Sequence, residues 1–218
     1  MNIISYALSK KGIIKIDGKQ YKPELKDGEI VYKEIEKPRE YTTFTVGPTD
    51  TGILVVVNNY ANSVEELYVN DVAQQVPVIS MAEIFESGGI EGEILSLISM
   101  LTVKEGDIIK IKGGFSLALN AMLENMINIS NIEIQSNLKD CSYMFGMCTS
   151  LIEAPVIPNS VTNCSSMFVM CTSLTTLPSE NVDLMYNHND ELQHDLCYSD
   201  CVNIINPISY DEIPDGWK

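Results

Sequence analysis

The sequence predicts an α+β fold in which a β-rich amino-terminal module is followed by a short solenoid of about three or four repeated units. Two observations indicate this fold class. The block at residues 141–151 recurs at residues 164–174, and alternating apolar and polar runs, punctuated by glycine and proline, precede it. With 218 residues, 45% of them hydrophobic, the chain has enough apolar surface to bury a core in one or two folding units.

Residues 1–40 are predicted to form an amino-terminal hairpin and docking arm. Apolar and polar side chains alternate over residues 12–21 around an Asp-Gly pair, which is a strong indicator of a β-hairpin turn. Residues 22–39 are charged, carry two prolines and include a candidate strand at residues 29–35, so we interpret them as a linker. The residues expected to make docking contacts are Ile3, Ile4, Tyr6, Leu8, Lys10 and Lys11.

Residues 41–112 are predicted to form the β-rich module. Its β-type runs lie at residues 41–46, 52–58, 66–69 and 107–112. Two helices are expected between these runs, at residues 81–87 and at residues 91–101, where apolar side chains recur at helical spacing. The second helix is interpreted as a core stripe or as the cap that closes the apolar end of the repeats.

Residues 113–218 are predicted to hold the repeats and a carboxyl-terminal cap. The block CSYMFGMCTSL at residues 141–151 recurs as CSSMFVMCTSL at residues 164–174, and each copy is followed by a proline in the same register. A worn third copy begins at Cys197, after an insertion around residues 186–194. A weaker, earlier copy without cysteine begins at Met122.

The spacing Met-Phe-x-x-Cys-x-x-Leu places apolar groups on one face of a short helical turn, and the following proline ends that turn in an extended path. A single repeat unit is too short to bury such a face alone, so the copies must stack. The residues expected in the shared core of the stack are Met144, Phe145, Cys148, Leu151, Met167, Phe168, Cys171, Leu174, Cys201 and Ile204.

These units resemble the BspA-like leucine-rich repeats, in which Met-Phe-x-x-Cys-x-x-Leu precedes a proline-containing strand. The resemblance covers residues 137–177 and extends weakly to residues 122–134 and to the tail. It implies a leucine-rich-repeat-type solenoid that recognises surfaces, as in bacterial surface adhesins, protist surface proteins and virion proteins of tailed phages, and it implies no catalytic residues. Residues 3–11 are also similar to the N-terminal segments of fibre and decoration proteins of gut phages, including crAss-like phages.

The formal charge of −16 is unevenly distributed along the chain. Residues 1–40 contain nine of the 14 basic residues against seven acidic ones, so the rest of the chain carries five basic and 23 acidic residues. Such an acidic body disfavours nucleic acid as a partner, because phosphate binding needs clustered Lys and Arg. No stretch reaches the roughly 20 apolar residues of a membrane span, and the opening lacks the pattern of an export signal, so neither membrane insertion nor export is expected.

All six cysteines lie beyond residue 140 and recur with the repeats. Free thiols that pack as small apolar groups are the preferred interpretation, with disulfides or a metal site as alternatives. The residue types of a zinc site occur at His188, His194, Cys197 and Cys201, but the two cysteines align with core positions of the repeat, so no metal is expected. The acidic stretch at residues 187–195 lacks the glycine and glutamate of an EF-hand.

No motif predicts an enzyme. The glycine cluster at residues 87–92 lacks the spacing of a dinucleotide fingerprint and the lysine of a phosphate loop, and the chain contains no Gly-x-Ser-x-Gly elbow. We therefore expect no catalytic residue and no cofactor.

Two functional hypotheses follow. The first is a non-catalytic virion structural protein, assembled in the host cytoplasm as a capsid- or tail-attached fibre or decoration component, whose basic arm docks onto other virion proteins. The second is a bacterial cell-surface adhesion or host-interaction module that binds protein or glycan through the repeat face. Either hypothesis is compatible with a homo-oligomer.

Overall fold

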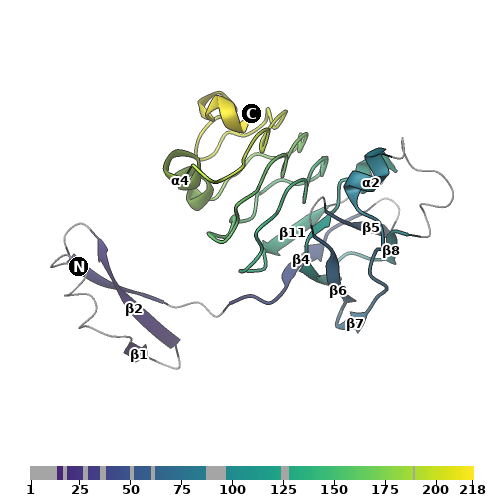
Figure 1. Cartoon of the computed structure of the whole chain (residues 1–218), viewed down its shortest axis with the longest axis horizontal. Coiled ribbons are helices and arrows are strands. Elements are labelled where there is room, and N and C mark those ends of the chain that lie inside the picture. Colours follow the sequence, from purple (N-terminus) through teal and green to yellow (C-terminus); the bar gives the residue numbers. More distant parts are fainter. Residues whose placement is uncertain are drawn as a thin grey trace. The chain divides into compact units, whose positions relative to one another are not determined.

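The computed structural model describes residues 14–16, 19–26, 29–34, 38–49, 52–59, 62–86, 97–123, 128–188 and 190–218. The chain consists of two compact units, Met1–Pro38 and Arg39–Lys218 (Figure 1). The six expected docking residues, Ile3, Ile4, Tyr6, Leu8, Lys10 and Lys11, lie outside the described residues. Among the helices of the described ranges, none has both the length and the apolar character needed to cross a membrane.

The amino-terminal unit is an antiparallel sheet with the strand order β1-β2-β3. β1 (Ile14–Ile16) pairs with β2 (Lys19–Lys26), and β2 pairs along its length with β3 (Glu29–Glu34). The candidate strand at residues 29–35 is confirmed as β3, whereas the interpretation as a linker was wrong for residues 22–26, which belong to β2. Pro23 is tolerated within β2 because β1 pairs only as far as Tyr21, so the missing N–H interrupts no bond to β1.

The second unit contains two antiparallel sheets and has a sheet-rich α+β fold, as the sequence predicts. The larger sheet has the order β11-β4-β9-β6-β7, and the smaller has the order β10-β5-β8. The strands of the larger sheet are β11 (Ile129–Glu133), β4 (Thr42–Val46), β9 (Ile108–Gly113), β6 (Val64–Val69) and β7 (Val72–Ala73). Those of the smaller sheet are β10 (Phe115–Ser116), β5 (Ile53–Asn58) and β8 (Ser99–Thr102).

One expected helix is present, and the described part of the other is not helical. α2 (Met81–Glu86) lies where the first helix was predicted. The prediction of a helix over residues 91–101 was wrong at its carboxyl end, where β8 pairs with β5; residues 91–96 lie outside the described ranges. Ser99 and Leu101 are buried while Met100 and Thr102 are exposed, so the burial follows the two-residue period of a strand.

Four short helical segments of the described residues were not predicted. They are α3 (Leu119–Met122), α4 (Ser179–Asn187) and the 3-10 helices η2 (Tyr210–Glu212) and η3 (Asp215–Trp217). α4 begins directly after Pro178 and fills part of the segment between the second and third copies of the repeat. The insertion predicted around residues 186–194 begins at the end of this helix.

The repeated blocks lie side by side in three successive coils, which we define as coil 1 (residues 138–157), coil 2 (residues 161–178) and coil 3 (residues 192–207) (Figure 1). Alternate backbone N–H groups of one coil donate to carbonyls of the next coil. In coil 1 the acceptor of Cys141 N–H is Asn163 and that of Met147 N–H is Val169, so the register between neighbouring coils stays constant. The donors are Cys141, Tyr143, Phe145 and Met147 in coil 1, and Cys164, Ser166, Phe168 and Met170 in coil 2.

The expected helical turn in each block is instead a chain of tight turns. The N–H groups of Met144, Cys148 and Leu151 donate three residues back, and Tyr143 and Met147 have positive φ angles of 58° and 59°. Coil 2 and coil 3 repeat this pair of left-handed residues at Ser166 and Met170 and at Leu196 and Asp200. The helical prediction was wrong because a helix would use every N–H internally, whereas these turns free alternate N–H groups for the neighbouring coil.

Aromatic rings form the spine of the stack. Phe168 lies between Phe145, at a centroid distance of 5.8 Å, and Tyr198, at 5.3 Å, and both pairs are within 10° of parallel. Phe115 of β10 meets Phe145 edge-on at 6.0 Å, and Trp217 lies 6.2 Å beyond Tyr198. A single hydrophobic cluster therefore extends from the large sheet through all three coils to the carboxyl end.

All ten residues expected in the shared core are buried, with exposed fractions between 0% and 4%. The proposed earlier copy beginning at Met122 was placed wrongly, because Met122 is 40% exposed. The segment that joins coil 1 on that side is instead Phe115–Ser116 and Leu117, whose N–H donates to the carbonyl of Met144 over 2.9 Å.

Candidate functional site

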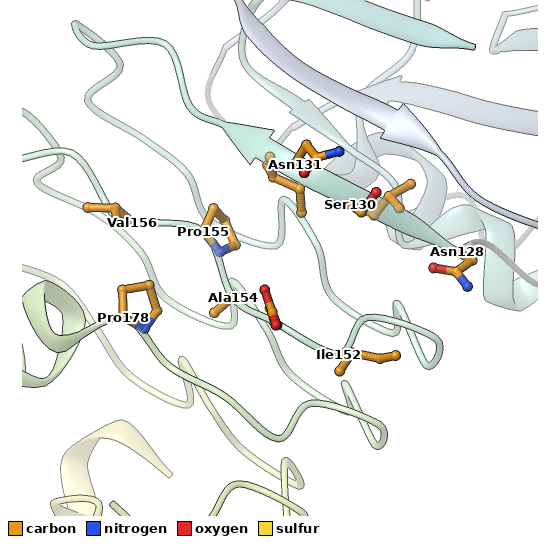
Figure 2. Close-up of a pocket in the computed structure, with 11 residues that line it drawn as sticks. Asn128, Ser130, Asn131, Ile152, Ala154, Pro155, Val156 and Pro178 are labelled. Atoms are coloured by element: carbon orange, nitrogen blue, oxygen red, sulfur yellow. The ribbon is translucent and has the colours of Figure 1, made fainter. Parts of the chain in front are cut away.

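A hollow of about 470 Å³ lies between β11 and coil 1 (Figure 2). It is lined by residues 128–132, by residues 152–156 and by Pro178. A second, shallower hollow shares Asn128 and Ile152 with it and includes Ser150 of coil 1. It continues across coils 2 and 3 at Ser173, Thr175, Asn203 and Ile205. We name the two together the strand-side groove.

Local sequence explains the shape of the groove. Asn131 has a positive φ of 51°, and the pairing register of β11 with β4 shifts between Ser130 and Glu133, so β11 bends there. On the opposite wall, Pro155 fixes an extended path after the turns of coil 1, because its ring excludes a continuing helix. Figure 2 shows Pro155 and Asn131 on opposite walls.

The groove is poor in charge although the chain carries −16. Glu153 is the single ionisable residue among those that line it, and the remaining side chains are Ser, Thr, Asn, Ala, Pro, Val and Ile. Three of the apolar side chains are well exposed: Ile152 by 53%, Val156 by 40% and Ile205 by 73%. Depletion of charge together with exposed apolar groups is typical of the centre of a binding interface.

The chemistry of the groove suits binding and not bond-breaking. General acid–base catalysis requires a positioned pair of titratable groups, and nucleophilic catalysis requires a nucleophile beside a base. Among the described residues that line the groove, Glu153 is the single ionisable group, so neither a second titratable group nor a nucleophile with a base stands beside it. Backbone groups, hydroxyls and amides are what the groove offers to a ligand.

The cysteines lie in the core of the coils and away from this groove. All six are free and buried. The Cys171 thiol donates to the carbonyl of Phe145 over 3.0 Å, and the Cys201 thiol donates to the carbonyl of Phe168 over 2.9 Å. Burial raises the pKa of the Cys148 thiol to about 12 and that of Cys197 well above its usual range, so these groups are thiols and not thiolates. Cysteine thus recurs in the repeat as a small apolar group that also donates to the preceding coil.

The histidines belong to the cap that covers coil 3. The ring of His194 stacks on Trp217 at 4.4 Å, and His188 lies edge-on to His194 at 4.7 Å. Tyr198 N–H donates to the carbonyl of Trp217 over 2.8 Å, which ties the carboxyl end to coil 3. Within the described ranges, no group of three or more His, Cys, Asp or Glu side chains is arranged to hold a metal ion. Cys197, the nearest candidate ligand in sequence, is fully buried in the stack.

Two buried asparagines, which the sequence analysis did not single out, fasten segments to one another. The Asn181 side chain of α4 accepts from Ile157 N–H over 2.9 Å and donates to the carbonyl of Pro155 over 2.9 Å. The Asn120 side chain of α3 accepts from Val55 N–H and donates to the Val55 carbonyl, both over 2.7 Å. Nothing in the local sequence marks these asparagines, because their partners lie 24 and 65 residues away.

A polar cluster on the large sheet was also missed. The hydroxyls of Tyr41 and Tyr68 both donate to Oε2 of Glu66 over 2.8 Å, and Lys112 Nζ donates to Oε1 over 3.0 Å. The bonds from Tyr68, Lys112 and Tyr41, in that order of effect, hold the pKa of Glu66 at about 2. A carboxylate bonded in this way is a weak base. Its bonds connect Tyr41, directly before β4, and Lys112 of β9 to Glu66 of β6.

Comparisons of this chain with protein-family models, with curated proteins and with solved structures found no significant match.

Proposed function

We propose that this chain is a non-catalytic virion structural protein, a fibre or decoration component attached to a capsid or tail, that presents its coils to a binding partner. In this proposal the three coils are leucine-rich-repeat-type units of BspA-like character, and the basic amino-terminal region, residues 1–40, docks onto other virion proteins. The observation that carries the proposal is the charge-poor strand-side groove, which runs across all three coils of an otherwise acidic chain.

Three further features support a binding or assembly role. The coils share a continuous core with the large sheet, so the groove is built on a rigid scaffold. The lining contains one carboxyl group and no second titratable group within its described residues, which gives little basis for catalysis. The unequal charge of the two regions, basic in residues 1–40 and acidic beyond, favours attachment through one end and exposure of the other.

The proposal is tested by mass spectrometry of purified particles from a culture that carries this gene. Peptides of this chain should co-purify with the particles, and a chain lacking residues 1–40 should be expressed yet absent from them. Incorporation that survives this deletion would contradict the assigned role of the arm.

A cell-surface adhesion module is the second candidate, and one observation favours it. The groove exposes hydroxyl and amide groups at Ser150, Ser173, Thr175 and Asn203, which are able to bond to the hydroxyls of a glycan. Ile205→Lys in the groove should then abolish binding to cells, while Val72→Lys should not, because Val72 is 63% exposed on β7 in the large sheet. Detection of the chain on cells and not in particles would decide for this candidate.

A further inference from the structure

The strand-side groove interrupts a hydrogen-bonded ladder. On the side of the coils, Thr176 N–H donates to the carbonyl of Ile152 over 3.3 Å, and Ala154 N–H donates to the carbonyl of Thr176 over 3.0 Å. These bonds form a parallel bridge between Glu153 and Thr176, and a second bridge joins Thr176 to Asn206. The ladder therefore runs from coil 3 through coil 2 to coil 1.

The last residue of this ladder turns its backbone toward the groove. In a parallel bridge the residue between the two bonded neighbours directs its own N–H and C=O to the opposite side. That residue is Glu153, which lines the hollow. Its N–H and C=O have no hydrogen-bond partner among the described residues.

The facing wall presents a second free edge. β11 is an edge strand of the large sheet, and Ile129 pairs with Val46. Val46 directs its own N–H and C=O to Asp107 and Gly106, while Gly47 N–H donates to the carbonyl of Asn128 over 2.7 Å. By the alternation of an antiparallel ladder, Ile129 therefore directs its N–H and C=O away from β4 and toward the groove. Backbone groups of an edge strand readily pair with another chain.

We propose that one extended segment of a partner polypeptide, uncharged or basic, inserts as a strand between β11 and coil 1. This inference rests on the proposed binding role and specifies the class of partner. The inserted strand would join the ladder of the coils to that of the large sheet, by bonding to Glu153 on one side and to Ile129 on the other. Acidic segments are disfavoured because Glu153 is the charge in the lining and the chain already carries −16.

The size of the hollow matches a short strand. With a rise of about 3.3 Å, a lateral spacing of about 4.8 Å and a thickness of about 10 Å, one strand residue occupies about 160 Å³. The hollow of about 470 Å³ therefore holds about three residues. Side chains on one face of the strand would meet Ile152 and Val156, which favours β-branched or small apolar residues at alternate positions.

The test is a selection of random ten-residue peptides, displayed on phage, against the full chain. Enriched peptides should lack acidic residues and carry β-branched residues at alternate positions. Their affinity should fall about tenfold for Glu153→Pro, which removes the N–H that faces the groove, and should be unchanged or higher for Glu153→Gln, which keeps that N–H and removes the charge. Absence of any enriched peptide, or equal binding to both variants, would overturn the inference.

Amide hydrogen exchange of the unmodified chain gives an independent readout if Glu153→Pro perturbs folding. The amides of Glu153 and Ile129 should exchange rapidly in the free chain and become at least tenfold slower with a saturating enriched peptide. Protection elsewhere, with these two amides unchanged, would also overturn strand insertion. Neither result depends on whether the chain is found in particles, so failure of this inference is distinguishable from failure of the proposed function.

Discussion

Replacement of Phe168 by alanine is the sharpest test of the stacked core. Phe168 is fully buried between two parallel rings, Phe145 at 5.8 Å and Tyr198 at 5.3 Å. Truncation of a buried Phe to Ala costs about 3–5 kcal/mol of unfolding free energy. The loss of the two ring pairs, each worth about 0.5–1.5 kcal/mol, forms part of that cost.

The upper part of this range is expected because the coils cannot close over the cavity. Phe168 N–H donates to Cys197 over 2.8 Å and Phe145 N–H to Met167 over 2.9 Å, so backbone bonds fix the spacing of the coils on both sides. We expect a loss of about 4–5 kcal/mol for Phe168→Ala. Phe168→Leu, which keeps most of the volume and loses the ring stacking, should cost about 1.5 kcal/mol.

Urea denaturation at room temperature, followed by far-ultraviolet circular dichroism, measures both losses against the unmodified chain. If Phe168→Ala removes most of the total stability, the variant will be unfolded before urea is added, and Phe168→Leu then gives the quantitative comparison. A cost below about 1 kcal/mol for the alanine variant would refute the stacking of the coils, because that value is typical of an exposed side chain.

The remaining predictions concern titratable and polar groups. Unfolded, unreduced protein should yield six reactive thiols, and the folded protein should react far more slowly because all six are buried; a count near zero would instead indicate disulfides. The Glu66 carboxyl should titrate near pH 2 by NMR, below its ordinary value of 4.5, so the stability it contributes is complete above about pH 4.5 and is lost as the pH falls toward 2. Glu66→Gln should remove that part of the pH dependence, and a titration midpoint near 4.5 would contradict the assignment. Asn181→Ala should cost about 3 kcal/mol in urea denaturation, since it leaves a buried N–H and a buried C=O without partners, whereas exposed Asn203→Ala should cost under about 1 kcal/mol.

The parts of the fold that could be predicted from the sequence are those with a local cause. The alternation in residues 41–46 reflects the two faces of β4, where Phe44 and Val46 are buried. Phe145 and Phe168 occur in nearly identical blocks, so their shared environment in the core could be expected from the repeat itself.

The parts that could not be predicted depend on segments far apart in the chain. The apolar run that includes Leu101 has helical spacing, but pairing of Leu101 with Leu54 makes it a strand. The turns of the coils require left-handed residues, and Tyr143, Ser166 and Leu196 share no side-chain type that would indicate this. The groove forms where the edge of β11 faces coil 1. It depends on two segments that are separate in the sequence, so the pattern of either segment alone does not predict it.

The constancy of the turns has a consequence for how such a chain can change in length. The two left-handed residues keep the same spacing in every coil. The connection from coil 2 to coil 3, from Met170 to Leu196, is however longer than the connection from coil 1 to coil 2, from Met147 to Ser166. The additional length is taken up around α4 and leaves the turns unchanged. The corner of the coil next to α4 therefore accommodates additional residues, and an epitope tag or a foreign loop grafted there should leave the register of the stack unchanged.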